Sequence, residues 1–179
     1  MMIFLLDSYM LSFHNQIMSR FSVISLFTVV IAAVYLVWWF SPNQIVTRQT
    51  HKIISCIDVP QTATKTYRAL KTNSFSNLLD KTVRCRVDIA NYQSDFSRDR
   101  LVESHQMFVQ NIDWATAKAS NTVIEVIDDQ NASAQSTIDF KVRTKKTESV
   151  NEIFTISMQW KKNADGKWLL TSLEMLGRN

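Results

Sequence analysis

Two cysteines, Cys56 and Cys85, are the side chains best suited to covalent or metal chemistry in this chain of 179 residues. In an oxidising compartment the two thiols could pair as a disulfide. Two free thiols are the alternative, because unpaired cysteine is among the most buried residue types. No metal site is expected, since the sequence has neither C-x-x-C nor H-x-x-x-H spacing.

Glycine is too scarce here for a phosphate-binding loop. The only glycines are Gly166 and Gly177, whereas nucleotide-binding loops and the nucleophile elbow each need several glycines in one short motif. We therefore expect no nucleotide-dependent chemistry and no cofactor. Lys and Arg total 20 against 16 Asp and Glu, and the net charge of +4 is spread along the chain. A nucleic-acid reader would gather its basic side chains on one face, so no nucleic-acid partner is expected.

Residues 21–40, with the sequence FSVISLFTVVIAAVYLVWWF, contain no charged residue, no glycine and no proline. At about 1.5 Å per residue, a helix of this length spans about 30 Å, which matches the hydrocarbon core of a bilayer. A signal peptide, with a shorter apolar run and a small-residue cleavage site, and a buried helix of a soluble protein are the alternatives. We predict an uncleaved single-pass membrane helix, with Tyr35, Trp38 and Trp39 at the interface.

This membrane helix divides the chain into three parts. Residues 1–20 form a short leader, in which Met18 is an alternative start, and residues 41–179 are long enough for one domain. The basic residues that flank the helix are nearly balanced, so charge does not set its orientation. A short N-terminal piece before a long domain favours an inner-membrane protein of bacterial type, with the N-terminus inside and a periplasmic domain.

Apolar spacing predicts three helices and a short strand after the membrane segment. The first helix runs from Asn43 to about Asp58, and the second, interrupted helix continues from Tyr67 to Val83. The short strand covers residues 83–89, where apolar and polar residues alternate. Ser94 and Ser97 are candidate caps for the third helix, which ends near residue 111.

The last third of the chain alternates between apolar and polar residues, as strands with one dry face do. The strands are expected around residues 114–127, 138–142, 154–160 and 168–175, with turns at 128–131 and 163–166. Four strands joined by short turns form an antiparallel meander. The predicted fold class is α+β: a transmembrane helix, then a cone-like domain of about three helices on a curved, mainly antiparallel sheet.

This order of elements resembles the nuclear transport factor 2-like family, also described as SnoaL-like or cystatin-like. The segment NADGKWLLTSLEM, with Asp165, Gly166 and Trp168, is similar to the closing hairpin of that family. The segment SRDRLVESHQMF is similar to the helix before its long strands. The resemblance covers about residues 44–176 and implies the fold, which hosts enzymes, ligand binders and assembly modules. In topology alone, the chain also resembles the inner-membrane assembly family of type IV secretion systems.

The resemblance implies a cavity between the helices and the sheet. Enzymes of the family present an Asp with a His or Tyr there as acid and base, which makes His105 and Asp113 the catalytic candidates. Asp139 or Glu125 would face inward if the strand register shifts by one residue. A hydrogen-bonded core histidine is the alternative for His105, which lies in an apolar helical stripe. The aromatic candidates for the cavity are Trp114, Phe140, Phe154 and Trp160.

The features together favour a membrane-anchored binding or assembly module without evident catalysis. The alternative is a small-molecule ligand-binding protein or enzyme of the SnoaL-like type that uses the cone cavity. The expected partners are the lipid bilayer, through residues 21–40, and other envelope proteins or a second copy of the chain. A cavity filled by the four aromatic side chains would exclude the alternative.

Overall fold

The computed structural model describes residues 27–88, 92–145 and 148–176, and it divides the chain into two units, residues 1–41 and 42–179. The second unit contains three helices and six strands in the described residues. They are α2 (Pro42–Ile57), α3 (Lys65–Ser76), β1 (Leu79–Val87), β2 (Tyr92–Ser97), α4 (Arg98–Asn111), β3 (Ile112–Val126), β4 (Asn131–Thr144), β5 (Val150–Lys162) and β6 (Trp168–Leu176). The α+β class and the three predicted helices of the domain are confirmed.

The first unit contains a helix over Phe27–Trp39. Large apolar side chains along this helix are exposed. Within the described part of the chain, no single helix is long and apolar enough to cross a membrane. Phe27–Trp39 and Pro42–Ile57 pass that test only when they are taken together as one broken pair. Residues 21–26 of the predicted membrane helix lie outside the described residues.

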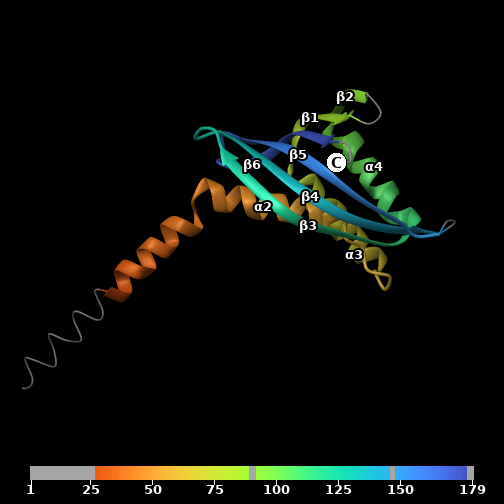
Figure 1. Cartoon of the computed structure of the whole chain (residues 1–179), viewed down its shortest axis with the longest axis horizontal. Helices are drawn as coiled ribbons and strands as arrows, with labels where there is room; N and C mark the ends of the chain where they lie inside the picture. The colour runs from red at the N-terminus through yellow and green to blue at the C-terminus, as the bar shows by residue number, and fades with distance from the viewer. Residues whose placement is uncertain (1–26, 89–91, 146–147, 177–179) are drawn as a thin grey trace, which may run out of the picture. The chain divides into compact units, whose positions relative to one another are not determined.

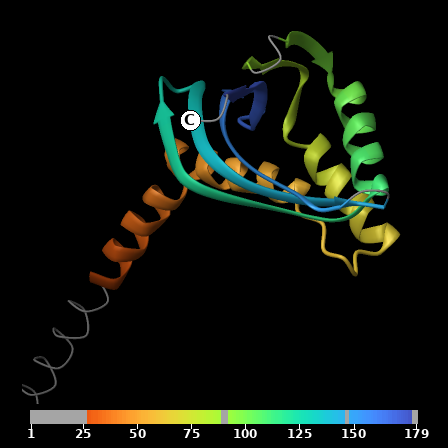
Figure 2. The same cartoon turned by 45° about the vertical axis from the view of Figure 1, so that its right-hand side comes forward.

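The six strands form one sheet in the order β2-β1-β6-β5-β4-β3. Neighbours β3, β4, β5 and β6 pair antiparallel, which confirms the predicted meander. Strand β1 pairs parallel with β6 and antiparallel with β2, so the sheet is mixed at this edge. The long strands bend along their length, as Figure 2 shows.

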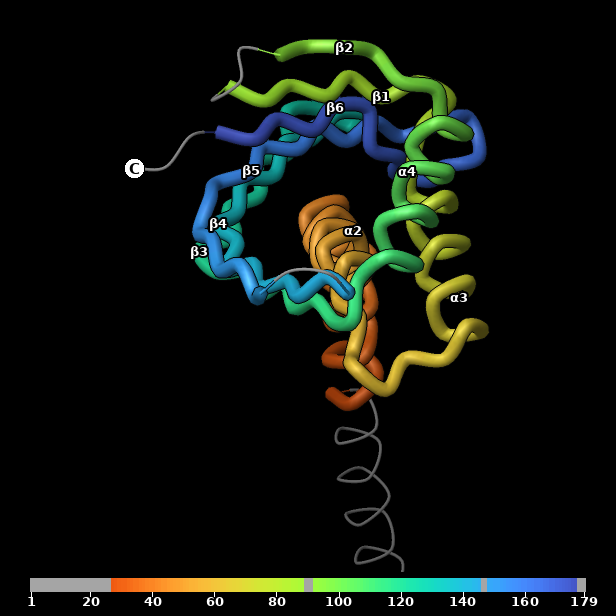
Figure 3. Tube along the Cα trace, turned by 90° about the vertical axis from the view of Figure 1, so that its right-hand side faces the viewer, coloured from red at the N-terminus to blue at the C-terminus, as the bar shows by residue number. Residues whose placement is uncertain are grey.

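The sheet curves around α2, and α3 and α4 lie along the open side of the curve (Figure 3). The predicted alternation in β4 is confirmed at Ile138 and Phe140, which both line the inward side, and it extends back through the buried Ala132, Ala134 and Ser136. Phe154, Ile156, Met158 and Trp160 share the inward face of β5 in the same way. Ala117 and Ala119 of β3 pack against the same core cluster, which also contains Ala132 and Ala134 of β4. Apolar residues of α2, including Val46 and Ile54, complete this core.

The interrupted second helix was predicted to extend to Val83, and this is wrong. Helix α3 ends at Ser76, where Asn77 caps it by donating its backbone N–H to the carbonyls of Asn73 and Phe75. Val83 instead lies in β1, between two hydrogen-bonded neighbours. Strand pairing on both sides overrides the local helical period, because Leu79 and Val83 bury their side chains equally well from a strand.

Strand β2 was not predicted. Among the described residues it pairs with β1 alone and is mostly exposed, so its sequence lacks the apolar alternation of a half-buried strand. Of the two candidate caps for the third helix, Ser97 is confirmed, because its hydroxyl accepts the backbone N–H of Arg100 at 3.4 Å. Ser94 lies within β2, opposite Cys85.

Register shifts in β3 and β6 change which side chains face inward. In β3 the register shifts between Ser120 and Val123, and Asn121 adopts a left-handed backbone with φ of 51°. In β6 the register shifts at Thr171, whose hydroxyl donates to the Gln159 carbonyl at 3.1 Å. Because an extra residue reverses the alternation, Leu173 faces the same side as the buried Leu170.

Arg68 joins α3 to the end of α4 and the start of β3. Its guanidinium donates to the backbone carbonyls of Val109, of Ile112 at 3.1 Å and of Asp113 at 3.2 Å. Its Nε also donates to the Ala63 carbonyl at 3.4 Å. The last carbonyls of a helix have no partner within the helix, so this one side chain caps α4 from a neighbouring element.

Candidate functional site: an apolar cavity in the cone

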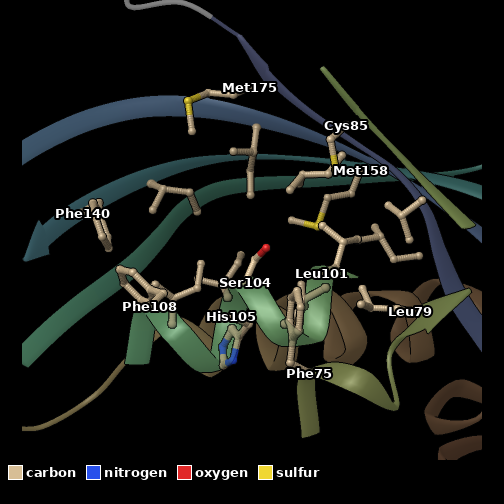
Figure 4. A pocket seen from close by; sticks show the side chains of 18 of the residues that line it. Phe75, Leu79, Cys85, Leu101, Ser104, His105, Phe108, Phe140, Met158 and Met175 are labelled. Atoms are coloured by element: carbon tan, nitrogen blue, oxygen red, sulfur yellow. The ribbon is translucent and has the colours of Figure 1, made fainter. Parts of the chain in front are cut away.

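The described part of the domain contains an apolar cavity of about 460 Å³ between the curved sheet and its helices. Figure 4 shows side chains from α4 and α3 below it and side chains from the strands above it. Most of the lining atoms are carbon and sulfur, contributed by residues such as Ile54, Leu101, Met158 and Leu173. Ser104 and Glu152 are the lining residues whose side chains carry oxygen. The predicted cavity is therefore open rather than filled.

His105 lies under the cavity floor with both ring nitrogens occupied. Its Nε2 lies 3.1 Å from the Cys56 carbonyl oxygen, so this nitrogen carries the proton and donates. Its Nδ1 lies 3.2 Å from the Thr72 hydroxyl, which can donate to it. The ring stacks on Phe75 at 4.4 Å between centroids, and its nitrogens point away from the cavity (Figure 4). The carbon atoms of the imidazole therefore face the cavity. The two nitrogens link α4 to α2 and α3 through their contacts with Cys56 and Thr72.

Burial lowers the pKa of His105, because it disfavours the charged imidazolium, although the hydrogen bond to the Cys56 carbonyl opposes this shift. The unfolded chain therefore binds the proton more readily than the folded one. The stability contributed by neutral His105 is complete above the ordinary histidine pKa of about 6.5. It is lost as the pH falls from that value through the lowered pKa of the folded state.

We expect His105→Gln to remove part of the loss of stability on acidification. The comparison is the free energy of unfolding in urea at about pH 7.5 and about pH 5.5, a window that contains the ordinary histidine pKa. Gln can still donate to the Cys56 carbonyl but does not titrate. The matched control is His51→Gln, which makes the same substitution at an exposed histidine outside the Cys56 and Thr72 contacts. An unchanged pH dependence in His105→Gln would contradict the assignment.

The carboxylates considered as acid or base partners do not line the cavity. Asp113 lies at the register shift between Ile112 and Trp114, with one oxygen 3.8 Å from the Arg143 Nε, and it is not among the lining residues. Asp139 lies opposite the inward face of β4 and is 3.9 Å from the Lys141 Nζ. Glu125 is exposed near the end of β3. The structure therefore does not bring His105 and Asp113 together at the cavity.

The four aromatic candidates separate into two groups. Phe140 and Phe154 line the cavity, and their ring centroids are 6.2 Å apart. Phe108 from α4 joins them, at 6.5 Å from Phe140. Trp160 is fully buried in the core instead, and Trp114 is half-buried on the same face as Asp139. Neither tryptophan is among the lining residues.

Both cysteines are free thiols in the structure, which agrees with the alternative of two unpaired thiols rather than a disulfide. Cys56 is buried in α2, and burial raises the pKa of its thiol. Cys85 lines the cavity, and burial, with a smaller effect from Asp95, raises the pKa of its thiol too. Thiols in this state are poor nucleophiles. Among the residues described, no three His, Cys, Asp or Glu side chains gather as a metal site would require.

Glu152 is an acidic lining residue that the sequence-based prediction missed. It lies on the inward face of β5, two residues before Phe154 and directly opposite Phe140 on β4. The sequence does contain a signal for this position. When the alternation from Phe154 to Trp160 is extended by two residues toward the N-terminus, Glu152 falls on the dry face of the strand.

Comparison with solved structures supports the nuclear transport factor 2-like fold. A "Nuclear transport factor 2 (NTF2-like) superfamily protein" from Salmonella enterica serovar Typhimurium aligns with a TM-score of 0.61 and 13% identity, over 76% of this chain and 91% of that one. A "Putative Scytalone Dehydratase" from Novosphingobium aromaticivorans aligns with a TM-score of 0.61 and 12% identity, over 76% and 83%. The association domain of CaMKII from C. elegans aligns with a TM-score of 0.53 and 13% identity, over 75% and 94%.

No protein-family model and no curated protein matches the sequence. At these identities the structural likeness establishes the fold and leaves the activity open. The chain thus has an NTF2-like, SnoaL-like α+β fold, and the resemblance stated from the sequence is confirmed at that level.

Proposed function

We propose that this domain binds an apolar small molecule in its cone cavity and that residues 21–40 hold it at a membrane. The observation that carries the binding function is the open cavity of about 460 Å³ with its carbon and sulfur lining. Pockets of this size and character are typical of small-molecule sites. Burial of apolar ligand surface stabilises a complex by about 25 cal/mol per Å² before the costs of association.

Binding is favoured over catalysis by the polar groups around the cavity. A general acid or base needs a proton-transferring atom within reach of the ligand. Both His105 nitrogens are engaged with Cys56 and Thr72 below the floor, and Asp113 does not line the cavity but pairs with Arg143. The fold is shared with a protein named as a dehydratase, but these two residues do not reproduce an acid–base pair at this cavity.

The membrane part of the proposal is supported by composition. Twenty consecutive residues without charge, glycine or proline suit a bilayer, and the aromatic cluster of Tyr35, Trp38 and Trp39 suits its interface. We place the N-terminus inside and the domain in the periplasm of a bacterial cell. An anchor would raise the local concentration of the domain for envelope partners or for other copies of the chain.

The cavity is tested by blocking it with one large side chain. In Leu173→Trp an indole would occupy the cavity, whereas in Leu169→Trp the same change lies on the opposite face of β6. The full chain in lipid nanodiscs would be exposed to a decanol that carries a photoreactive diazirine. We expect labelling of cavity peptides in the wild type and in Leu169→Trp, and a loss of at least about tenfold in Leu173→Trp, because the ligand and the indole compete for one space. Equal labelling of all three proteins would refute cavity binding.

A further inference from the structure

The inward position of Glu152 reverses the usual pattern of a strand. From Phe154 to Lys161 of β5, apolar side chains face inward and polar ones face outward. At Glu152 a carboxylate lies on the cavity side, while the next residue, Ile153, faces outward and is 54% exposed. The buried residues Ile156, Met158 and Trp160 fix the register, so Glu152 cannot turn outward without moving the whole strand.

Glu152 has no cationic partner within the described part of the protein. The five ion pairs there involve Asp88, Asp95, Asp113, Asp139 and Glu174. The Glu152 side chain is exposed, so it is hydrated when the cavity holds no ligand. A carboxylate beside apolar walls can then pair with a cationic group of an incoming molecule. A charge pair formed there is less screened than one in bulk water.

Aromatic rings lie next to this carboxylate. Phe140 is its direct cross-strand neighbour, and Phe154 is two residues further along the same face of β5. Phe108 completes the aromatic cluster from α4. Aromatic faces attract organic cations through the ring quadrupole, and a carboxylate adds direct charge attraction. Rings and a carboxylate together form a recognition pattern for an ammonium group.

Resting on the proposed cavity-binding function, we propose that the ligand is an apolar organic amine whose ammonium group meets Glu152 while its hydrocarbon part fills the cavity. At about 30 Å³ per water-sized group, the cavity volume of about 460 Å³ accommodates about fifteen non-hydrogen atoms. Ser104, whose hydroxyl points toward the cavity in Figure 4, provides one hydrogen-bonding group inside. The amine is bound as a ligand, and no bond is made or broken.

The experiment compares three probes with the same chain and different polar ends. Diazirine-bearing decylamine, decanol and decanoic acid would each be cross-linked to the full chain in nanodiscs, and labelled cavity peptides would be quantified. We expect the amine to label about tenfold more than the acid in the wild type, because Glu152 attracts the first and repels the second. In Glu152→Gln the amine-to-acid labelling ratio of cavity peptides should fall to within about twofold of the same ratio for peptides outside the cavity.

Glu125→Gln is the matched control, since it removes an exposed carboxylate on β3 that does not line the cavity. It should leave the amine-to-acid ratio unchanged. The amine proposal is overturned if the acid labels as strongly as the amine in the wild type, or if the preference survives in Glu152→Gln. The two proposals fail separately. If decanol labels the cavity but the amine is not preferred over the acid, only the amine proposal is refuted. If no probe labels cavity peptides more strongly in the wild type than in Leu173→Trp, the binding function itself is refuted.

Discussion

Replacing Val30 and Val34 with lysine is expected to move the protein from the membrane fraction to the soluble or aggregated fraction. The two positions lie near the middle of residues 21–40, one helical turn apart. Each lysine at the centre of a membrane helix costs about 2.5–3.5 kcal/mol of insertion free energy, so the pair costs about 5–7 kcal/mol. The measurement is the fraction of protein that resists extraction of membranes with alkaline carbonate.

Val30→Leu with Val34→Leu is the matched control, because it keeps the segment apolar and should remain in the membrane. Carbonate extraction of the unaltered protein, or retention of the double-lysine variant, would contradict the anchor. A reporter fused after Asn179 that is active only in the periplasm would test the orientation on the same material. Activity of a cytoplasmic reporter at that position would reverse the proposed topology.

Arg68→Met is expected to lower the free energy of unfolding of the domain by about 3 kcal/mol. The substitution preserves much of the apolar stem but removes the guanidinium that serves carbonyls at the end of α4 and the start of β3. Hydrogen bonds from a charged donor contribute about 1.5–3 kcal/mol each when lost from a buried site, and partial exposure of this site lets water replace some of them. The destabilisation should therefore be well below the sum of the individual bonds.

Urea unfolding of residues 42–179, which form a unit of their own, measures this change. Arg68→Lys should recover only part of the loss, because one ammonium cannot reproduce the planar fork of the guanidinium. Arg143→Met is the control at the same end of the fold: its side chain is 55% exposed and pairs with Asp113 at 3.8 Å. Exposed pairs contribute about 0–1 kcal/mol. A loss in Arg68→Met no larger than in Arg143→Met would show that the cap adds no stability.

The sequence predicts the meander well because its strands are half-buried and long. Each of β4 and β5 carries several alternating residues on one dry face, and such a pattern has few competing interpretations. The end of α3 and the exposed β2 were missed for the opposite reason. Strand β2 depends on pairing with β1, and the end of α3 depends on tertiary burial. Neither effect produces a periodic pattern of apolar residues in the local sequence.

The candidate site is less predictable than the fold because its character depends on contacts between distant segments. The apolar stripe correctly placed His105 on the helical layer, but only the structure shows that Cys56 and Thr72 occupy its nitrogens. Two of the four aromatic candidates, Phe140 and Phe154, line the cavity, whereas Trp160 packs into the core. The difference arises from strand curvature and from which helix lies opposite each residue.

The place of β6 in the sheet sets the order in which this domain can be completed. Strand β6 lies between β5 and β1, although it is the last strand in the chain and β1 is the first. Until β6 arrives, β5 and β1 both have open edges, and Leu170, Leu173 and Met175 are missing from the cavity wall. A chain that has not yet paired β6 therefore has no complete cavity, and its unpaired edges are exposed to aggregation during that interval. The cavity that we propose as a binding site is complete only after β6 has paired with both β5 and β1.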